Sequence, residues 1–141
     1  MKKLGLLLIT TLLLTGCDSN NYDYSCTKTD TSDVYKKTET IKLGFDSNKV
    51  YKLASEIVEE HTTDDSINNA YANYQNKYDN YNENNVVAEY KKNEKKLNAT
   101  YYLDKSDIDN MKIELPYDFT MTKDKFLKSL EESGYKCKEE K

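Results

Sequence analysis

Apolar and polar positions alternate along residues 35–46. The odd positions Ile41, Leu43 and Phe45 are apolar and alternate with the polar even positions Thr38, Thr40 and Lys42. A period of two is typical of a strand with one buried face. The turn residues that follow predict a hairpin, with a second strand over 50–61, although a helical spacing also fits that segment and its pattern leaves both conformations open.

A helical period appears after residues 62–65, which offer N-cap candidates and early negative charge. Ile67 and four tyrosines then recur at steps of 4, 3, 4 and 3 residues, which places them on one face of a helix. Such a face normally packs on a sheet. Alternatively, it could stack on sugars or line a peptide groove, so the candidate ligand-binding residues are Tyr71, Tyr74, Tyr78 and Tyr81.

Three further patterns follow along the chain. Residues 86–103 alternate about a central turn and predict a second hairpin. The alternation over 111–115 predicts another strand, which Pro116 ends. Thr122 can cap a last helix, and Gly134 stands where the C′ glycine of that helix is expected.

The expected order of elements is therefore β-β-α-β-β-β-α. Residues 31–141 are long enough for a single domain with one modest core. We expect an α+β two-layer sandwich, in which an antiparallel sheet of about five strands carries two helices on one face.

The start of the chain has the layout of an export signal. Two lysines precede the apolar stretch 4–14, which is too short to span a bilayer, because spanning needs about 20 apolar residues. Its length suits a secretory signal peptide. Residues 13–17, Leu-Leu-Thr-Gly-Cys, resemble the lipobox of bacterial lipoproteins. The resemblance implies that residues 1–16 are removed and that Cys17 is lipidated.

Lipidation would hold the protein at the outer face of the cytoplasmic membrane, since acyl chains contribute about 0.8 kcal/mol per buried CH₂. The alternative is an exported protein whose Cys17 is unmodified. Residues 17–30 are polar and without period, so we expect the lipidated cysteine to be followed by a flexible tether.

The charged residues of the chain argue against some classes of binding partner. Without the leader the chain has 19 lysines and 25 acidic residues, a net charge of −6, and it contains no arginine. These features argue against nucleic-acid binding and against bidentate phosphate or carboxylate recognition. The fourteen Asn and thirteen Tyr residues are explained better by an AT-rich genome than by selection for an aromatic surface.

Two cysteines remain once Cys17 is assigned to lipid. Cys26 and Cys137 lie near opposite ends of the expected domain, and in an exported protein such a pair is expected to form a disulfide. Spacing does not show that the two Cβ atoms approach each other. Free thiols therefore remain the alternative, and metal binding by two cysteines is less favoured.

A family resemblance rests on several segments of this layout. They are "YKKTETIKLGF" before a turn, the mid-chain helix, "VVAEYKKNEKKLNATYYLD" and the closing "LEESGYKCK". With the anchored cysteine, these segments are similar to the YehR-like (DUF1307) lipoproteins. Because that family has no assigned activity, the resemblance implies fold and location only.

The sequence offers little catalytic chemistry. His61 is the only histidine, and it stands beside two glutamates without a serine or cysteine motif, so we expect a structural role. Asp104, Asp107 and Asp109 lack the glycine and the final glutamate of a calcium loop, the latter being Leu115 here. A solvated turn is expected there, and we predict neither a metal nor a cofactor.

The function that fits these observations is a small non-enzymatic binding or accessory module of the cell envelope. Its partners would be the membrane, through the N-terminal lipid, and an envelope protein or cell-wall ligand, with no nucleic acid. An envelope enzyme or a protein inhibitor is the alternative.

Overall fold

A computed structural model describes residues 21–140 of the chain. The expected leader 1–16 and Cys17 lie outside these residues. No helix of the described part is long and apolar enough to cross a membrane. The elements are β1 (Tyr24–Thr31), β2 (Tyr35–Asp46), β3 (Lys49–His61), α1 (Asp64–Glu83), β4 (Val87–Asn93), β5 (Lys96–Leu103), α2 (Lys105–Asp109), α3 (Lys123–Glu132) and β6 (Lys136–Glu139).

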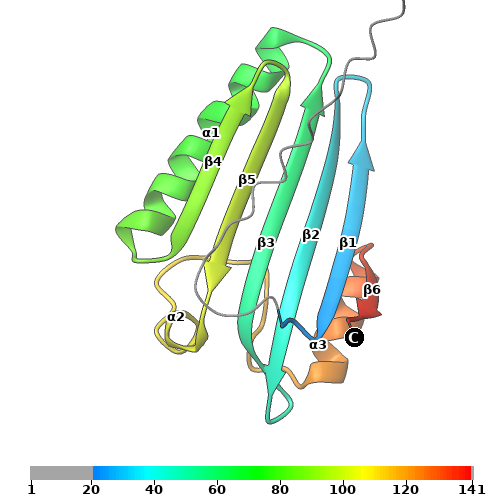
Figure 1. Cartoon of the computed structure of the whole chain (residues 1–141), viewed down its shortest axis with the longest axis vertical. Coiled ribbons are helices and arrows are strands. Elements are labelled where there is room, and N and C mark those ends of the chain that lie inside the picture. Colours follow the sequence, from blue (N-terminus) through cyan, green and yellow to red (C-terminus); the bar gives the residue numbers. More distant parts are fainter. Residues whose placement is uncertain (1–20, 141) are drawn as a thin grey trace, which may run out of the picture.

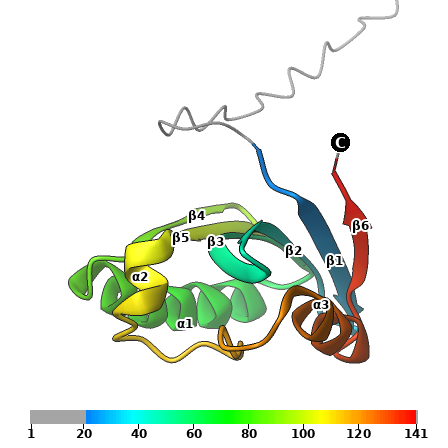
Figure 2. The same ribbon diagram turned by 90° about the horizontal axis from the view of Figure 1, so that it is seen from below.

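The strands form one six-stranded sheet in the order β4-β5-β3-β2-β1-β6, and every neighbouring pair is antiparallel. Both longer helices lie on the same side of this sheet (Figures 1 and 2). The helix α1 packs against β4, β5 and β3, whereas α3 packs beside β6. The α+β class and its two layers are confirmed, with one strand more than the sequence predicted.

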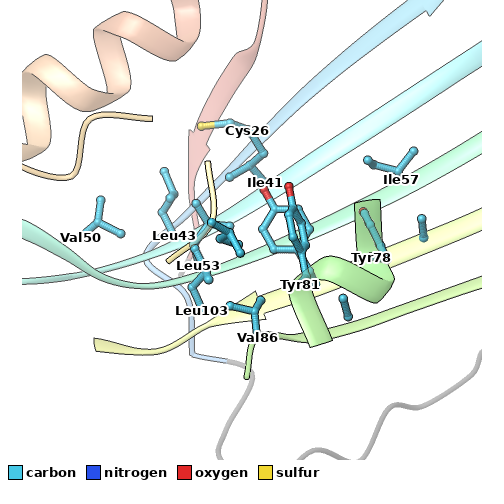
Figure 3. Close-up of a cluster of buried hydrophobic side chains, with 14 of the residues drawn as sticks. Cys26, Ile41, Leu43, Val50, Leu53, Ile57, Tyr78, Tyr81, Val86 and Leu103 are labelled. Carbon is cyan, nitrogen blue, oxygen red and sulfur yellow. The ribbon is translucent and has the colours of Figure 1, made fainter. Parts of the chain in front are cut away.

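The core lies between the sheet and these helices. Alternate residues of the strands point toward the helices, as the period of two requires, and many of them are fully buried, including Ile41, Leu43, Leu53 and Leu97. Figure 3 shows how residues of β1, β2, β3 and α1 meet in this cluster. Segment 50–61, which was ambiguous from its pattern, is the strand β3.

Residues 24–31 form β1, although the sequence predicted a flexible tether up to residue 30. This strand pairs with β2 over its whole length, yet most of its side chains are polar. One of its faces is open to solvent, where threonines pair across the strands: Thr27 with Thr40 and Thr29 with Thr38, both at 3.3 Å between hydroxyl oxygens. An open polar face needs few apolar residues, so no apolar alternation marks β1.

The predicted strand over 111–115 is wrong. These residues form an irregular connection between α2 and α3, although Ile113 is buried and its apolar neighbours Met111 and Leu115 pack partly against the core. This connection runs on the helix side of the sheet (Figure 2) and pairs with no strand. The alternation of apolar residues therefore reflects which side chains are buried. It does not indicate a strand that pairs with the sheet.

The end of α3 confirms the expected role of Gly134. Its φ is +96°, the left-handed conformation that glycine adopts without a steric penalty. The amide of Gly134 donates to Glu131 O at 3.0 Å and the amide of Tyr135 donates to Leu130 O at 3.1 Å. These two bonds are those of a Schellman motif, and they fix where the chain emerges after the helix.

The Cys26–Cys137 disulfide is present, as the cysteine count predicted. The two residues face each other in the register between β1 and β6, and Cys26 is fully buried. The bond thus attaches an edge strand of four residues to the rest of the sheet.

Candidate functional site

The structure divides the four candidate tyrosines of α1 into two groups. Tyr78 and Tyr81 are 0% and 3% exposed, and their rings stack on each other with centroids 5.4 Å apart. Both rings also meet the ring of Tyr101 edge-on. Tyr78 and Tyr81 therefore belong to the core and cannot present a flat aromatic platform to a ligand.

Tyr71 and Tyr74 are only partly buried. The ring of Tyr71 packs edge-on against Tyr90 near the outer edge of the sheet, with centroids 5.5 Å apart. Tyr74 lies on the opposite side of the tyrosine stripe and lines a pocket of about 380 Å³. Of the four candidates, Tyr74 is the one that the structure brings into a ligand-sized space.

This pocket opens where α1, the centre of the sheet and the α2–α3 connection meet. We call it the tyrosine pocket, because four tyrosines from separate segments line it. They are Tyr74 of α1, Tyr101 of β5, Tyr117 of the connection and Tyr135, which follows α3. The Schellman motif directs Tyr135 toward this pocket, and Tyr117 is held by ring contacts to Phe119 and Phe126 with centroids 6.0 Å away.

Three charged residues also line the pocket, together with Ile57, Asn73 and Pro116. Lys37 and Glu39 lie on β2, and Lys77 lies one turn after Tyr74 on α1. The Lys37 ammonium lies 3.9 Å from a Glu39 carboxylate oxygen, with the two side chains 29% and 17% exposed. Lys37 and Glu39 lie on the same face of β2 as Ile41 and Leu43. The strand therefore places an ammonium and a carboxylate on its core-facing side.

The surroundings keep the tyrosine hydroxyls protonated. Desolvation by burial raises the pKa of Tyr74, Tyr117 and Tyr135 well above the ordinary value, and the negative charge of Glu39 adds to the shift of each. The hydroxyl of Tyr135 also hydrogen-bonds the Glu39 side chain, which raises its pKa further. These hydroxyls are therefore neutral. Those of Tyr74 and Tyr135 donate their protons to the carboxylates of Glu59 and Glu39, so toward a ligand these two groups can accept hydrogen bonds.

Lys77 is affected in the opposite sense. Although the residue as a whole is exposed, desolvation lowers the pKa of its ammonium, and the positive charge of Lys37 lowers it further, against a smaller opposing effect of Glu39. Lys37 and Lys77 both line the pocket, and the charge of one ammonium group disfavours the charge of the other.

A hydrogen-bonded network of four side chains adjoins the pocket. His61 Nε2 lies 2.9 Å from Glu59 Oε2, and His61 Nδ1 lies 2.6 Å from Ser66 Oγ. The Tyr74 hydroxyl donates to Glu59 Oε1 at 2.7 Å. A neutral imidazole protonated at Nε2 pairs each of these groups, since it donates to Glu59 and accepts from Ser66. The network links the end of β3 to the start of α1 and orients Tyr74.

The network contains the residue types of a nucleophilic set, which sequence reasoning did not bring together. Ser66 belongs to the first turn of α1, whereas Glu59 and His61 end β3, and no local motif joins them. The serine contacts Nδ1 and the carboxylate contacts Nε2, the reverse of the arrangement in serine proteases. Neither the tyrosine pocket nor the second hollow described next includes Ser66 or His61.

A second hollow of about 420 Å³ lies near the β2–β3 turn. Two of its charged groups, Asp23 and Lys123, already have partners within the protein. The Asp23 carboxylate accepts from the amide of Phe45 at 2.6 Å, and the Lys123 ammonium lies over the ring of Tyr24, 5.6 Å from the centroid. These contacts attach the start of the domain to the turn and leave the tyrosine pocket as the better candidate site.

The aspartates near residue 104 have structural roles. Asp104 and Asp107 form a reciprocal capping box at the start of α2, and the Asp109 carboxylate accepts from Lys105 at 2.6 Å. Within residues 21–140 no three acidic, histidine or cysteine side chains gather as a metal site.

One sequence signal of the pocket could have been recognised. Lys37 and Glu39 interrupt the inward-facing phase of an otherwise apolar strand, and charged residues are almost never fully buried without a partner or a nearby opening. Tyr117 and Tyr135 carry no comparable signal, because they lie in irregular segments.

Comparisons of the chain with protein-family models, with curated proteins and with solved structures find no match. The identity of the site therefore has to be argued from its geometry and chemistry.

Proposed function

We propose that this chain is a lipid-anchored binding module of the cell envelope and that the tyrosine pocket holds its ligand. One observation carries the proposal: a pocket of about 380 Å³ in which four tyrosines surround a carboxylate and two lysines. Ligand sites are typically concave, with volumes of roughly 300–1,000 Å³, aromatic walls and a few polar groups that fix orientation. The pocket fits that description.

The proposed role is binding and not catalysis. The pocket has aromatic rings, charged groups and the amide of Asn73, but its lining contains no histidine, serine or cysteine. The hydroxyls of Tyr74 and Tyr135 already donate hydrogen bonds to the carboxylates of Glu59 and Glu39. Such an arrangement holds and orients a ligand without supplying a nucleophile.

Anchoring through Cys17 accounts for the location in this proposal. The lipobox-like end of the leader and the similarity to the YehR-like (DUF1307) lipoproteins both support it. Six residues separate Cys17 from β1, and six extended residues span at most about 20 Å. The domain would stay close to the membrane surface, within reach of envelope polymers and membrane proteins.

The anchor is tested by fractionation of cells that express the full chain. Cys17→Ala should abolish lipidation and leader cleavage and thereby change the electrophoretic mobility, whereas Cys26→Ala should leave lipid labelling intact. Unchanged labelling with radioactive palmitate in the Cys17→Ala variant would contradict the lipoprotein assignment.

The binding role is tested with the purified mature protein in detergent and a soluble digest of cell wall. Tyr117→Ala should abolish binding, because it removes one wall of the pocket. Tyr71→Ala is the matched control, since it removes a tyrosine of similar burial that lies outside the pocket. No binding of any fragment by the wild-type protein, or equal binding by both variants, would refute the proposal.

An envelope hydrolase is the second candidate, and the Ser66–His61–Glu59 contacts favour it. A fluorophosphonate probe should then label Ser66 in the wild-type protein and not in the His61→Gln variant. An unlabelled Ser66 under conditions that label a control serine hydrolase excludes this candidate.

A further inference from the structure

The charges of the tyrosine pocket indicate what kind of ligand it takes, an inference that rests on the binding function proposed above. The pocket carries two ammonium groups and one carboxylate, so its lining has an excess of positive charge in a chain whose net charge is −4. A site of opposite sign to the rest of the protein selects an anion from its surroundings.

Lys77 is the source of that excess. Lys37 approaches Glu39 at 3.9 Å, but in the described part of the chain Lys77 forms no ion pair and no side-chain hydrogen bond. Its nearest aromatic contact is the ring of Tyr81, with the ammonium 5.7 Å from the centroid. Among the described residues the Lys77 ammonium therefore has no anionic partner, although the residue lines the pocket.

An oxyanion beside Lys77 and Lys37 would supply the anionic partner that Lys77 lacks. It would accept a charge-assisted hydrogen bond from the Lys77 ammonium, and its negative charge would offset the repulsion between the two lysines. Glu39 repels an anion at its own end of the pocket. The charges therefore favour one orientation, with the anionic group toward Lys77 and neutral groups toward Glu39.

The remaining lining fits a hydroxylated ring. Tyrosine rings offer apolar faces with hydroxyl oxygens at their edges, which can accept hydrogen bonds from a ligand. Glu39 can accept hydrogen bonds from hydroxyls, and Asn73 can both donate and accept. These are the groups that a sugar ring with hydroxyl and amide substituents requires. From this combination we infer that the pocket binds an acidic saccharide, with its ring among the tyrosines and its oxyanion at Lys77 and Lys37.

The oxyanion can come from two sources. A sugar acid carries a carboxylate, and a sugar phosphate carries a phosphoryl group. The pocket contains lysines and no arginine, so recognition depends on charge and not on a planar bidentate fit. Lysine ammonium groups accept both anions, and the ligand panel must separate them.

The test is calorimetric titration of the mature wild-type protein with three probes of similar size. They are N-acetylmuramic acid, which carries a carboxylate, N-acetylglucosamine 1-phosphate and neutral N-acetylglucosamine. At least one acidic sugar should bind about tenfold or more tightly than the neutral sugar, a typical gain for a hydrogen bond to a charged group. The affinity should fall with added salt, because the contact is ionic.

Lys77→Met retains most of the side-chain stem and removes the charge, so it should reduce affinity for the acidic sugar to about that for the neutral one. Lys128→Met is the matched control, since Lys128 lies on α3 with its side chain 75% exposed and outside the pocket. Thermal melting of both variants checks that the fold is unchanged.

The outcomes of these titrations distinguish the acidic-saccharide inference from the proposed binding function. Equal binding of neutral and acidic sugars, with no effect of Lys77→Met, would overturn this inference and leave the pocket as a binding site. Acid-selective binding that survives both Lys77→Met and Lys37→Met would also overturn it, because the anion would then lie elsewhere. Failure of all three probes, while wall-digest fragments still bind, refutes the saccharide class, whereas failure of the digest as well refutes the proposed function itself.

Discussion

Buried tyrosine hydroxyls have two kinds of environment in this protein. The hydroxyl of Tyr74 donates to the Glu59 carboxylate at 2.7 Å, and Glu59 also contacts His61. The hydroxyl of Tyr78 is buried without a hydrogen-bond partner in the described part of the chain. Burial of an unpaired polar group costs free energy, whereas removal of one partner from a buried pair costs more. The same chemical change should therefore have opposite consequences at these two positions.

Tyr78→Phe should leave the free energy of unfolding unchanged or raise it by up to about 1 kcal/mol, because the lost hydroxyl has no partner. Tyr74→Phe should lower it by roughly 1–3 kcal/mol, because the Glu59 carboxylate loses a donor. Urea denaturation of both variants measures the difference. A larger loss for Tyr78→Phe than for Tyr74→Phe would mean that the contacts of the two hydroxyls are assigned wrongly.

At the scale of elements, the polar strands β1 and β6 stabilise each other at one edge of the sheet. β6 has four residues, pairs only with β1 and is attached by Cys26–Cys137. A short polar edge strand contributes little apolar burial, so the covalent bond compensates for a weak packing interaction. The same bond closes a loop between residues 111 positions apart, which restricts the unfolded chain.

The Cys26→Ala/Cys137→Ala double variant should therefore unfold with a free energy lower by about 3–5 kcal/mol, as the chain-entropy model gives for a loop of this length. Reduction of the wild-type protein should produce a similar loss. Thermal melting with and without reductant checks this, and hydrogen exchange should show that amides of β6 lose protection first. Identical melting in both conditions would contradict a stabilising bond.

At the scale of the whole molecule, tyrosines form part of the core and also line the pocket. Desolvation by burial raises the pKa of Tyr81 to about 12 and raises the pKa of Tyr78, Tyr101 and Tyr117 beyond that. In the unfolded chain each of these groups titrates near pH 10. The folded state therefore binds protons more tightly than the unfolded state at alkaline pH.

The sign of the pH dependence follows from linkage. Because the pKa values are raised in the folded state, their stabilising contribution is complete below about pH 10 and is lost as the pH rises through the folded-state values. We expect a cooperative alkaline unfolding transition in which tyrosinate absorbance and loss of circular dichroism coincide. Full tyrosine ionisation near pH 10 with the circular dichroism unchanged would show that these rings are accessible.

Local patterns were sufficient to predict much of this architecture. The period of two in β2, the tyrosine stripe of α1 and the glycine that ends α3 each depend on neighbouring residues, so the sequence alone predicts them. The α+β class follows from the order of these elements. The pairing of Cys26 with Cys137 was predicted by elimination, because one cysteine matched a lipobox and two remained.

Tertiary structure decided the rest. β1 is a strand because β2 and β6 offer hydrogen-bond partners on both sides, although its own residues lack an apolar period. Residues 111–115 alternate like a strand, but the connection between α2 and α3 runs on the helix side of the sheet and does not lie along an edge strand. The tyrosine pocket combines Tyr74, Tyr101, Tyr117 and Tyr135 from four segments, and its charge comes from β2 and α1. Local sequence determines which face of an element is apolar, whereas long-range packing determines which elements meet and therefore which polar groups converge on one site.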